Sequence, residues 1–408
     1  SLSDLRITGC DLPRIDLKWN RCLTNLDLSD NSLSVLDLSG ANGDYGKNVL
    51  THVDASDNRI ASFVLNDLSA LLSLDLSDNS LSEIALDRAS RLETLVLARN
   101  PLTAIDLEDC EALVTLDASG CLLTSLPVAS YTPLANLDVT ANLFTIPALY
   151  PLAGIANLRY APQTPIQLPA TAPTVNLSKQ ILDIDGMTTS FEWVLVSDGR
   201  VLDSSEVSGT DGRFKFLDPE LGEVYCRMSH PLFPDFSGDN AYVTTNIKPA
   251  GMPTHVFASF MPSFDADGYL TMTGRTNGTT VYVDWNGDGN LMQYILKDTY
   301  TEYPATVKAG TEVKCYAYDK DCGVTVFSLN GFPLSSIDAS GLTGLKALSI
   351  SGAGLDDGDI IYPEVPSLSE LTLDDNNLTT IPIDRYPNLR LLAVGKNPLG
   401  TLDITSLK

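Results

Sequence analysis

One pattern of leucines and an asparagine recurs along the first part of the chain and constrains its fold more than any other feature. In the segment LTNLDLSDNSL, from Leu23 to Leu33, apolar residues alternate before an asparagine that another leucine follows. Asn79 and Asn100 stand 21 residues apart, and most neighbouring copies keep this spacing. A copy this short cannot bury an apolar face alone. Neighbouring copies must therefore stack on one another to build a continuous core.

Eight copies follow one another in this register. Their asparagine positions hold Cys10, Asn31, Asn58, Asn79, Asn100, Cys121, Asn142 and Gln163. The step from Asn31 to Asn58 is longer, at 27 residues, and glycines between Gly40 and Asn48 indicate a loop there. Alternating leucines predict a short strand in each copy, with its leucines in the core and the flanking side chains on a concave surface. The returning segments are too short for a full helix.

The asparagine position predicts a structural amide. A buried asparagine at a bend can donate to and accept from backbone groups that would otherwise lack partners. Cys10 and Cys121 occupy the same position, so we interpret both as structural residues and not as redox or metal-binding groups. Cys315 and Cys322 are close in sequence and could bridge across a hairpin in an oxidising compartment.

A second block of four copies appears near the carboxyl end, clearest in LSELTLDDNNL from Leu368 to Leu378. Four copies exceed the minimum of about three that stacking requires. We predict a mostly β chain, a leucine-rich-repeat solenoid with short repeats and parallel strands on the concave face, in two blocks that flank one or two β-sandwich modules. The predicted domains are a repeat block at 1–166, an immunoglobulin-like sandwich at 167–250, a smaller β module at 251–323 and a repeat block at 324–408. Whether the two blocks form one continuous solenoid stays open at this stage.

Between the blocks, short runs of alternating apolar and polar residues replace the repeat. The proline-rich stretch from Gln163 to Pro173 marks the boundary. The runs FEWVLV and GEVYCRMS resemble strands of an immunoglobulin-like module, in which Trp193 and Cys226 are expected in the core. The segment TVYVDWNGDG, from Thr280 to Gly289, resembles a turn of polycystic-kidney-disease-type β-sandwiches, which serve as spacers on surface proteins.

The same turn offers a candidate calcium site. Asp284, Asn286 and Asp288 match alternating oxygen-ligand positions of an EF-hand loop, and Gly289 matches its glycine. The position of the bidentate glutamate is held by Ile295. Calcium is therefore one interpretation of this turn, and a plain hairpin turn is the favoured one.

Composition and motifs exclude several functions. The 26 basic residues against 52 acidic ones give a formal net charge of -26, which repels nucleic acid and anionic membranes. No apolar run reaches the ~20 residues that span a bilayer, and Ser1 lies inside a repeat, so we expect a processed or trimmed amino terminus. Zincin, nucleophile-elbow and P-loop motifs are absent, and the three histidines are isolated. We expect no enzyme activity and no cofactor beyond a possible calcium ion.

The segments from Leu23 to Leu33 and from Leu368 to Leu378 resemble the internalin-like leucine-rich-repeat proteins of bacterial surfaces, whose arrays are joined to immunoglobulin-like modules. The resemblance implies an extracellular or cell-surface recognition and adhesion protein that binds a protein or glycan on a host or neighbouring cell. A rigid surface spacer is the first alternative. A carbohydrate-active enzyme with its site in the β insertion is the second.

A row of carboxylates is predicted on the concave face. The central exposed positions of the eight strands are Arg6, Asp27, Asp54, Asp75, Val96, Asp117, Asp138 and Arg159. Neighbouring strands lie about 4.8 Å apart, so like charges in this row repel one another unless they are partnered. A cationic partner surface or a divalent ion would relieve the repulsion. The candidate partner-binding residues are Asp27, Asp54, Asp75, Asp117, Asp138 and Arg159, and the competing interpretation is that aspartate is only a soluble consensus residue there.

Overall fold

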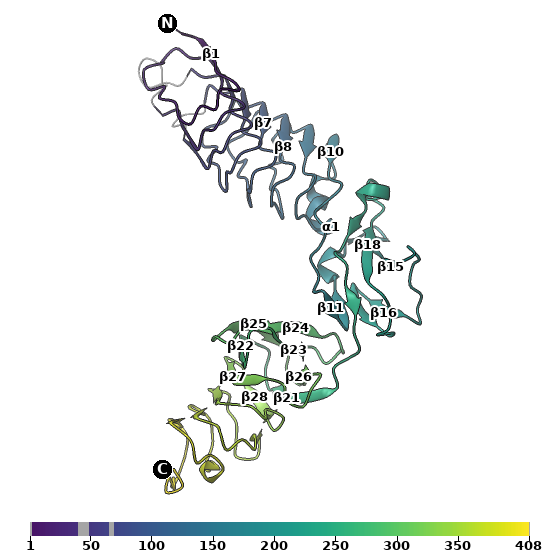
Figure 1. Cartoon of the computed structure of the whole chain (residues 1–408), viewed down its shortest axis with the longest axis vertical. Helices are drawn as coiled ribbons and strands as arrows, with labels where there is room; N and C mark the ends of the chain where they lie inside the picture. The colour runs from purple at the N-terminus through teal and green to yellow at the C-terminus, as the bar shows by residue number, and fades with distance from the viewer. Residues whose placement is uncertain (1, 40–48, 65–68, 408) are drawn as a thin grey trace. The chain divides into compact units, whose positions relative to one another are not determined.

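The computed structural model describes residues 2–39, 49–64 and 69–407 (Figure 1). The loop predicted at 40–48 lies outside them. As predicted, the chain is mostly β, and its repeats form a solenoid of stacked parallel coils. The chain forms two compact units. Unit 1 consists of Ser1–Leu168, Ser178–Val201 and Tyr225–Asn246. Unit 2 consists of Pro169–Leu177, Leu202–Val224 and Ile247–Lys408. Among the described residues, no helix has both the length and the apolar character to cross a membrane.

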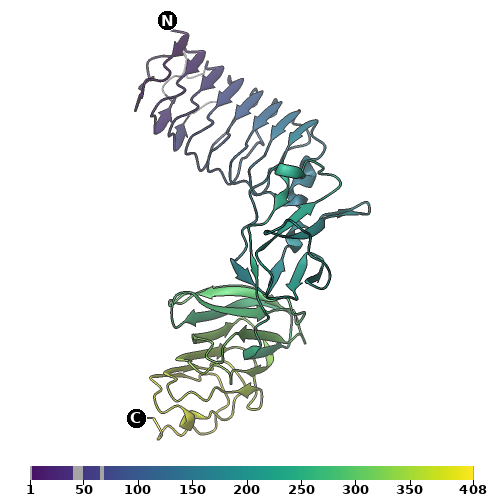
Figure 2. The ribbon, with the colours of Figure 1, turned by 45° about the vertical axis from the view of Figure 1, so that its right-hand side comes forward.

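Unit 1 is built on a parallel sheet of eight three-residue strands, one from each repeat, which stand side by side in Figure 2. These strands are β1 (Asp4–Arg6), β2 (Asn25–Asp27), β4 (His52–Asp54), β6 (Ser73–Asp75), β7 (Thr94–Val96), β8 (Thr115–Asp117), β9 (Asn136–Asp138) and β10 (Asn157–Arg159). The middle residue of each strand is apolar and turns to the core, where Leu74 and Leu95 are fully buried. On the returning side, β3 (Val35–Asp37) pairs with β5 (Ser62–Val64), and one return holds α1 (Ile146–Leu149) and η2 (Tyr150–Leu152).

The repeat asparagine holds each bend, as its position in the sequence predicts. The Asn79 amide nitrogen donates to the carbonyls of Ala55 at 2.9 Å and Leu76 at 3.1 Å. Its oxygen accepts from the Ile60 backbone N–H at 2.8 Å. Equivalent amide bonds are made by Asn31, Asn58, Asn100, Asn142, Gln163, Asn376 and Asn397. At the same position Cys121 offers only its thiol, 3.4 Å from the Leu97 carbonyl.

The residue before the asparagine has a left-handed backbone in most copies. Asp30, Asp57 and Asp78 have φ values of 55°, 52° and 53°, and Gly120 before Cys121 has 66°. Aspartate and glycine tolerate this conformation better than other residues do. Backbone geometry therefore favours the Asp-Asn pair of the repeat, although Arg99, Ala141 and Lys396 adopt the same conformation in other copies.

An aromatic cluster closes the last repeat of unit 1. The Tyr160 ring meets Phe233 and Phe236 edge-on, with centroids 5.2 and 5.0 Å away. The Tyr242 hydroxyl donates to the carbonyl of Phe144 at 2.8 Å. Tyr242 lies on β19 (Tyr242–Val243), which pairs in one sheet with β18 (Val224–Ser229), and β18 pairs with β15 (Ser190–Leu195). Phe233 and Phe236 lie between β18 and β19 in the chain. Strands β13 (Asp183–Ile184) and β14 (Met187–Thr188) form a hairpin that follows η3 (Ser178–Gln180). Trp193 and Cys226, expected in a core, are buried.

Unit 2 takes the remaining strands of the region 167–250 and the whole of the chain after it. Its first strands are β11 (Thr171–Ala172), β12 (Thr174–Asn176), β16 (Val207–Thr210), β17 (Arg213–Phe216) and β20 (Lys248–Pro249). One six-stranded sheet contains β21 (His255–Pro262), β23 (Thr279–Asp284), β24 (Met292–Leu296), β26 (Val313–Ala317), β28 (Leu334–Asp338) and β30 (Ile360–Ile361). The other contains β22 (Ala266–Gly274), β25 (Glu302–Val307), β27 (Val324–Asn330), β29 (Ala347–Ser351), β31 (Glu370–Thr372) and β32 (Leu391–Ala393).

The β module at 251–323 and the repeat block at 324–408 share these two sheets. Strand β27 pairs antiparallel with β22 on one side and parallel with the repeat strand β29 on the other. One cluster of buried side chains includes Phe260 and Val283 from the module together with Phe327, Leu348 and Leu371. The first strands of this repeat block therefore continue the sheets of the β module by direct hydrogen bonding.

Candidate functional site

The concave face of unit 1 places all six predicted partner-binding residues in one row. The parallel register pairs Asp27 with Asp54, Asp54 with Asp75, and Asp117 with Asp138. We call the residues Arg6, Asp27, Asp54, Asp75, Val96, Asp117, Asp138 and Arg159 the concave row. A hollow of about 450 Å³ lies over β1, β2, β4 and β6 and is lined by the first part of this row.

One oxygen of each carboxylate in the concave row is held by the chain itself. The Asp54 Oδ1 atom accepts from the backbone N–H of Ser56 at 3.0 Å and from its hydroxyl at 2.7 Å. The same pair of bonds joins Asp75 to Ser77, and the pattern extends to Asp27, Asp138 and, through the backbone alone, Asp117. The serine or threonine two residues after each aspartate therefore caps the strand end, which is a structural reason for the recurring Asp-Leu-Ser.

The two ends of the concave row are neutralised, and its centre is not. Arg6 Nε lies 3.0 Å from Asp27 Oδ2, and an Arg159 nitrogen lies 2.6 Å from Asp138 Oδ2. No salt bridge reaches Asp54, Asp75 or Asp117 within the described ranges of the chain. Burial raises the pKa of Asp75, and the like charges of Asp54 and Asp117 raise it further. Negative charge therefore accumulates at the middle strands.

We expect Asp75→Asn to raise the free energy of unfolding at neutral pH. Because the pKa of Asp75 is raised in the folded state, its ionisation costs stability above that pKa, and the cost disappears as the pH falls to the ordinary value of 3.8 and below. Asparagine can still accept the Ser77 hydrogen bonds. Urea denaturation of both proteins at pH 7 and at low pH measures the difference, which should shrink on acidification. Asp27→Asn, which removes the Arg6 ion pair, should not stabilise, and equal stability of Asp75→Asn and the parent at pH 7 would contradict the prediction.

The predicted calcium ligands lie on the turn between β23 and β24. The two Asp284 carboxylate oxygens accept from the backbone N–H groups of Asp288 at 3.2 Å and Gly289 at 3.0 Å. Asp288 accepts from the Asn290 backbone at 2.9 Å, and Asn286 is exposed at the tip. No group of three or more histidine, cysteine, aspartate or glutamate side chains suited to a metal occurs in the part of the chain that the structure describes. These bonds are those of a hairpin turn, and calcium binding here stays a prediction.

The cysteines are all free thiols. Burial raises the pKa of Cys110 to about 11, and it also raises the pKa values of Cys121, Cys315 and Cys322. A thiol whose pKa is raised carries little thiolate at neutral pH and reacts slowly. These four side chains therefore act as core residues.

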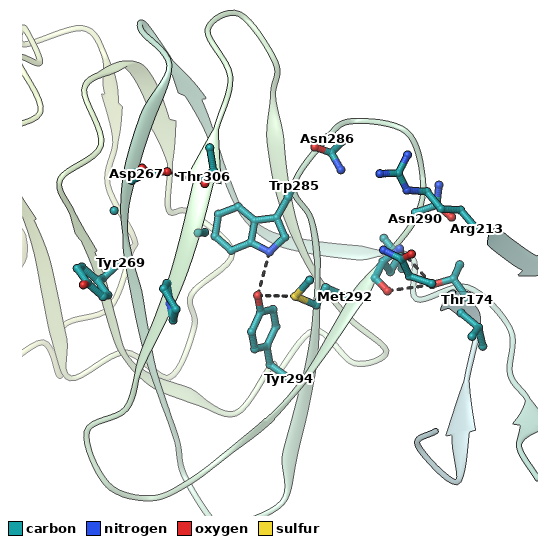
Figure 3. A pocket seen from close by; sticks show the side chains of 16 residues that line it. Thr174, Arg213, Asp267, Tyr269, Trp285, Asn286, Asn290, Met292, Tyr294 and Thr306 are labelled. Carbon is teal, nitrogen blue, oxygen red and sulfur yellow. Dashed lines mark hydrogen bonds between the residues drawn. The ribbon is translucent and has the colours of Figure 1, made fainter. Parts of the chain in front are cut away.

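A pocket of about 540 Å³ lies in unit 2, and of the three predicted calcium ligands Asn286 lines it (Figure 3). Its floor contains Trp285, whose indole N–H donates to the Tyr294 hydroxyl at 2.9 Å, while that hydroxyl donates to the Met292 sulfur at 2.9 Å. In its wall, β12 is hydrogen-bonded to the residue before β24: the Thr174 hydroxyl donates to the Leu291 carbonyl at 2.9 Å and accepts from the Leu291 N–H at 3.1 Å. The lining residues come from five separate stretches of chain, so no local sequence motif predicts the pocket.

Comparison with family models and with curated proteins finds no match. Among solved structures, one that is similar is described as the functional domain of InlJ from Listeria monocytogenes, which includes a cysteine ladder. The match has 19% sequence identity and a TM-score of 0.38, and it covers 62% of this chain and 62% of that one. It therefore spans less than two thirds of the InlJ domain.

Proposed function

We propose that this protein is a non-catalytic recognition and adhesion protein of an extracellular or cell-surface location, and that its concave row binds a basic region of a protein partner. The observation that carries the proposal is the uncompensated centre of the row. Asp54, Asp75 and Asp117 stand in register without a salt bridge among the described residues, while arginines neutralise both ends. Lysine or arginine side chains of a partner would relieve the repulsion at these strands.

The structural role of these aspartates does not require their charge. Each one caps its strand end through a single oxygen, Oδ1, and an asparagine would make the same bonds without repelling its neighbours. No salt bridge reaches the second oxygen of these carboxylates among the described residues, and the Arg99 guanidinium, which is bonded to Asp78, reaches Asp117 only through its charge. The charge is therefore better explained by recognition than by folding.

The test replaces the central charges and leaves the caps intact. We expect Asp54→Asn, Asp75→Asn and Asp117→Asn combined to weaken binding of a synthetic lysine- and arginine-rich peptide by about tenfold to a hundredfold, since each exposed pair contributes roughly 0.5–1 kcal/mol. Surface plasmon resonance measures the affinity at two salt concentrations, and added salt should weaken the parent more than the variant.

The matched control is Glu83→Gln, Glu93→Gln and Glu111→Gln combined, which removes the same charge from exposed positions outside the concave row. This control should bind as the parent does. Equal losses in both triple variants would mean that only net charge matters. Unchanged binding in the concave variant would refute the proposal and favour a surface spacer.

A further inference from the structure

The pocket of unit 2 has a rigid aromatic floor. Behind it, the Trp285 ring contacts the core through Phe260, with centroids 6.2 Å apart and nearly perpendicular planes, and through Phe332 at 6.4 Å. In front, the bonds through Tyr294 and Met292 fix the indole N–H. Because the indole polar group is already satisfied, Trp285 can offer a ligand only an apolar surface. A floor fixed in this way loses little entropy when a ligand binds.

The rim of the same pocket carries polar groups from different elements. Figure 3 shows Trp285 between two groups, Asp267, Tyr269 and Thr306 on one side and Asn286, Asn290 and Arg213 on the other. The side-chain amides of Asn286 and Asn290 make no hydrogen bond within the described parts of the chain. The Arg213 guanidinium nitrogen lies 3.9 Å from the Asp288 carboxylate oxygen, which is beyond hydrogen-bonding distance. The rim therefore holds donors and acceptors that are available to a ligand.

The balance of these groups selects the ligand chemistry. The lining residues include one cation, Arg213, and one carboxylate, Asp267, so the pocket favours neither a phosphate nor a polycation. Amide side chains donate and accept together, which matches hydroxyl groups that do the same. Tyr269 is 47% exposed and presents a second aromatic surface near Pro304. A sugar ring combines an apolar C–H face with a rim of hydroxyls and fits this arrangement.

We propose that this pocket binds a segment of a neutral glycan, and that it does so without cleaving it. Its volume lies within the range of about 300–1,000 Å³ that ligand sites occupy. Glycoside hydrolysis needs two carboxyl groups across the scissile bond, and Asp267 is the single acidic residue among those lining the pocket. The site is separate from the concave row, so the two proposals stand or fall independently.

The experiment titrates the whole chain with maltohexaose, cellohexaose, xylohexaose, mannohexaose and chitohexaose by isothermal titration calorimetry. We expect at least one of them to bind with a dissociation constant between about 1 μM and 1 mM. Tyr269→Ala and the double variant Asn286→Ala with Asn290→Ala should each weaken that binding by at least about tenfold, through lost stacking and lost hydrogen bonds. All three changed residues are at the surface and are expected to leave folding intact.

The controls are Asn240→Ala and Arg390→Ala, which alter exposed residues that do not line the pocket, and both should bind as the parent does. The triple variant of the concave row should also bind normally. The proposal is overturned if none of the five oligosaccharides binds, or if binding survives both pocket variants. Binding of choline or of a basic peptide through these residues, with no oligosaccharide bound, would likewise overturn the ligand class.

Discussion

Asn142→Ala is expected to lower the free energy of unfolding by about 3–5 kcal/mol. The Asn142 side chain is fully buried, and its amide donates to the carbonyls of Ala118 at 2.8 Å, Val139 at 3.2 Å and Thr140 at 3.1 Å. Its oxygen accepts from the Leu123 N–H at 2.9 Å. Alanine leaves these backbone groups buried and without partners. Urea denaturation followed by circular dichroism measures the loss.

Two further substitutions test whether the loss of stability in Asn142→Ala comes from the buried amide and not from any substitution in the repeats. Asn157→Ala changes an exposed asparagine of β10 and should cost less than about 1 kcal/mol. Cys121→Asn should increase stability by about 1 kcal/mol, because an amide restores donors and an acceptor where the thiol makes only weak bonds to the Leu97 and Ser119 carbonyls. A loss for Asn142→Ala no larger than that for Asn157→Ala would show that the buried amide is not what holds the bend.

Phe327→Ala is expected to destabilise unit 2 by about 3–5 kcal/mol and to shift the unfolding of the β module and the second repeat block together. Phe327 is fully buried on β27, where it pairs with Met272 of the module on one side and Leu348 of the repeats on the other. A cavity at this position removes packing from both parts of one core. Hydrogen exchange followed by mass spectrometry reports on each part separately, and protection should fall equally in β22 and in β29.

Phe264→Ala is the matched control, since Phe264 is 69% exposed and its loss should cost less than about 0.5 kcal/mol. If Phe327→Ala reduced protection in the repeats but left β22 protected, the module and the repeats would be independent folding units. Equal loss in both supports a single cooperative core that runs through residue 323.

The sequence was sufficient to predict the repeats because every copy carries its own signal. Alternating leucines, the asparagine and the spacing recur, so the strands, their parallel order and the concave row followed from one template. The Asp-Leu-Ser cap is harder to predict, because the serine serves mainly to hold Asp54 and its equivalents through hydrogen bonds two residues apart. A hydrogen bond between two polar residues that are two positions apart does not change the hydrophobic pattern, so that pattern cannot predict it.

The pocket and the shared core of unit 2 depend on long-range packing. Thr174 and Leu291 are 117 residues apart and exchange hydrogen bonds, yet neither has a distinctive sequence setting. Strand β27 reads as the first strand of a repeat, and nothing near it indicates that β22 pairs along its other edge. Such contacts join segments that differ in their sequence pattern, which is why the sequence alone predicts the segment from 251 to 323 as a separate module.

Pro304 sits in the middle of β25, the outermost strand of its sheet, opposite Tyr269. Proline has no backbone N–H, and within sheets it is tolerated where that missing donor would face outward. A strand from another molecule approaching β25 would therefore find a gap in the row of donors it needs. The sheet is closed at this side to growth by strand addition, a safeguard against edge-to-edge aggregation in a chain rich in short strands.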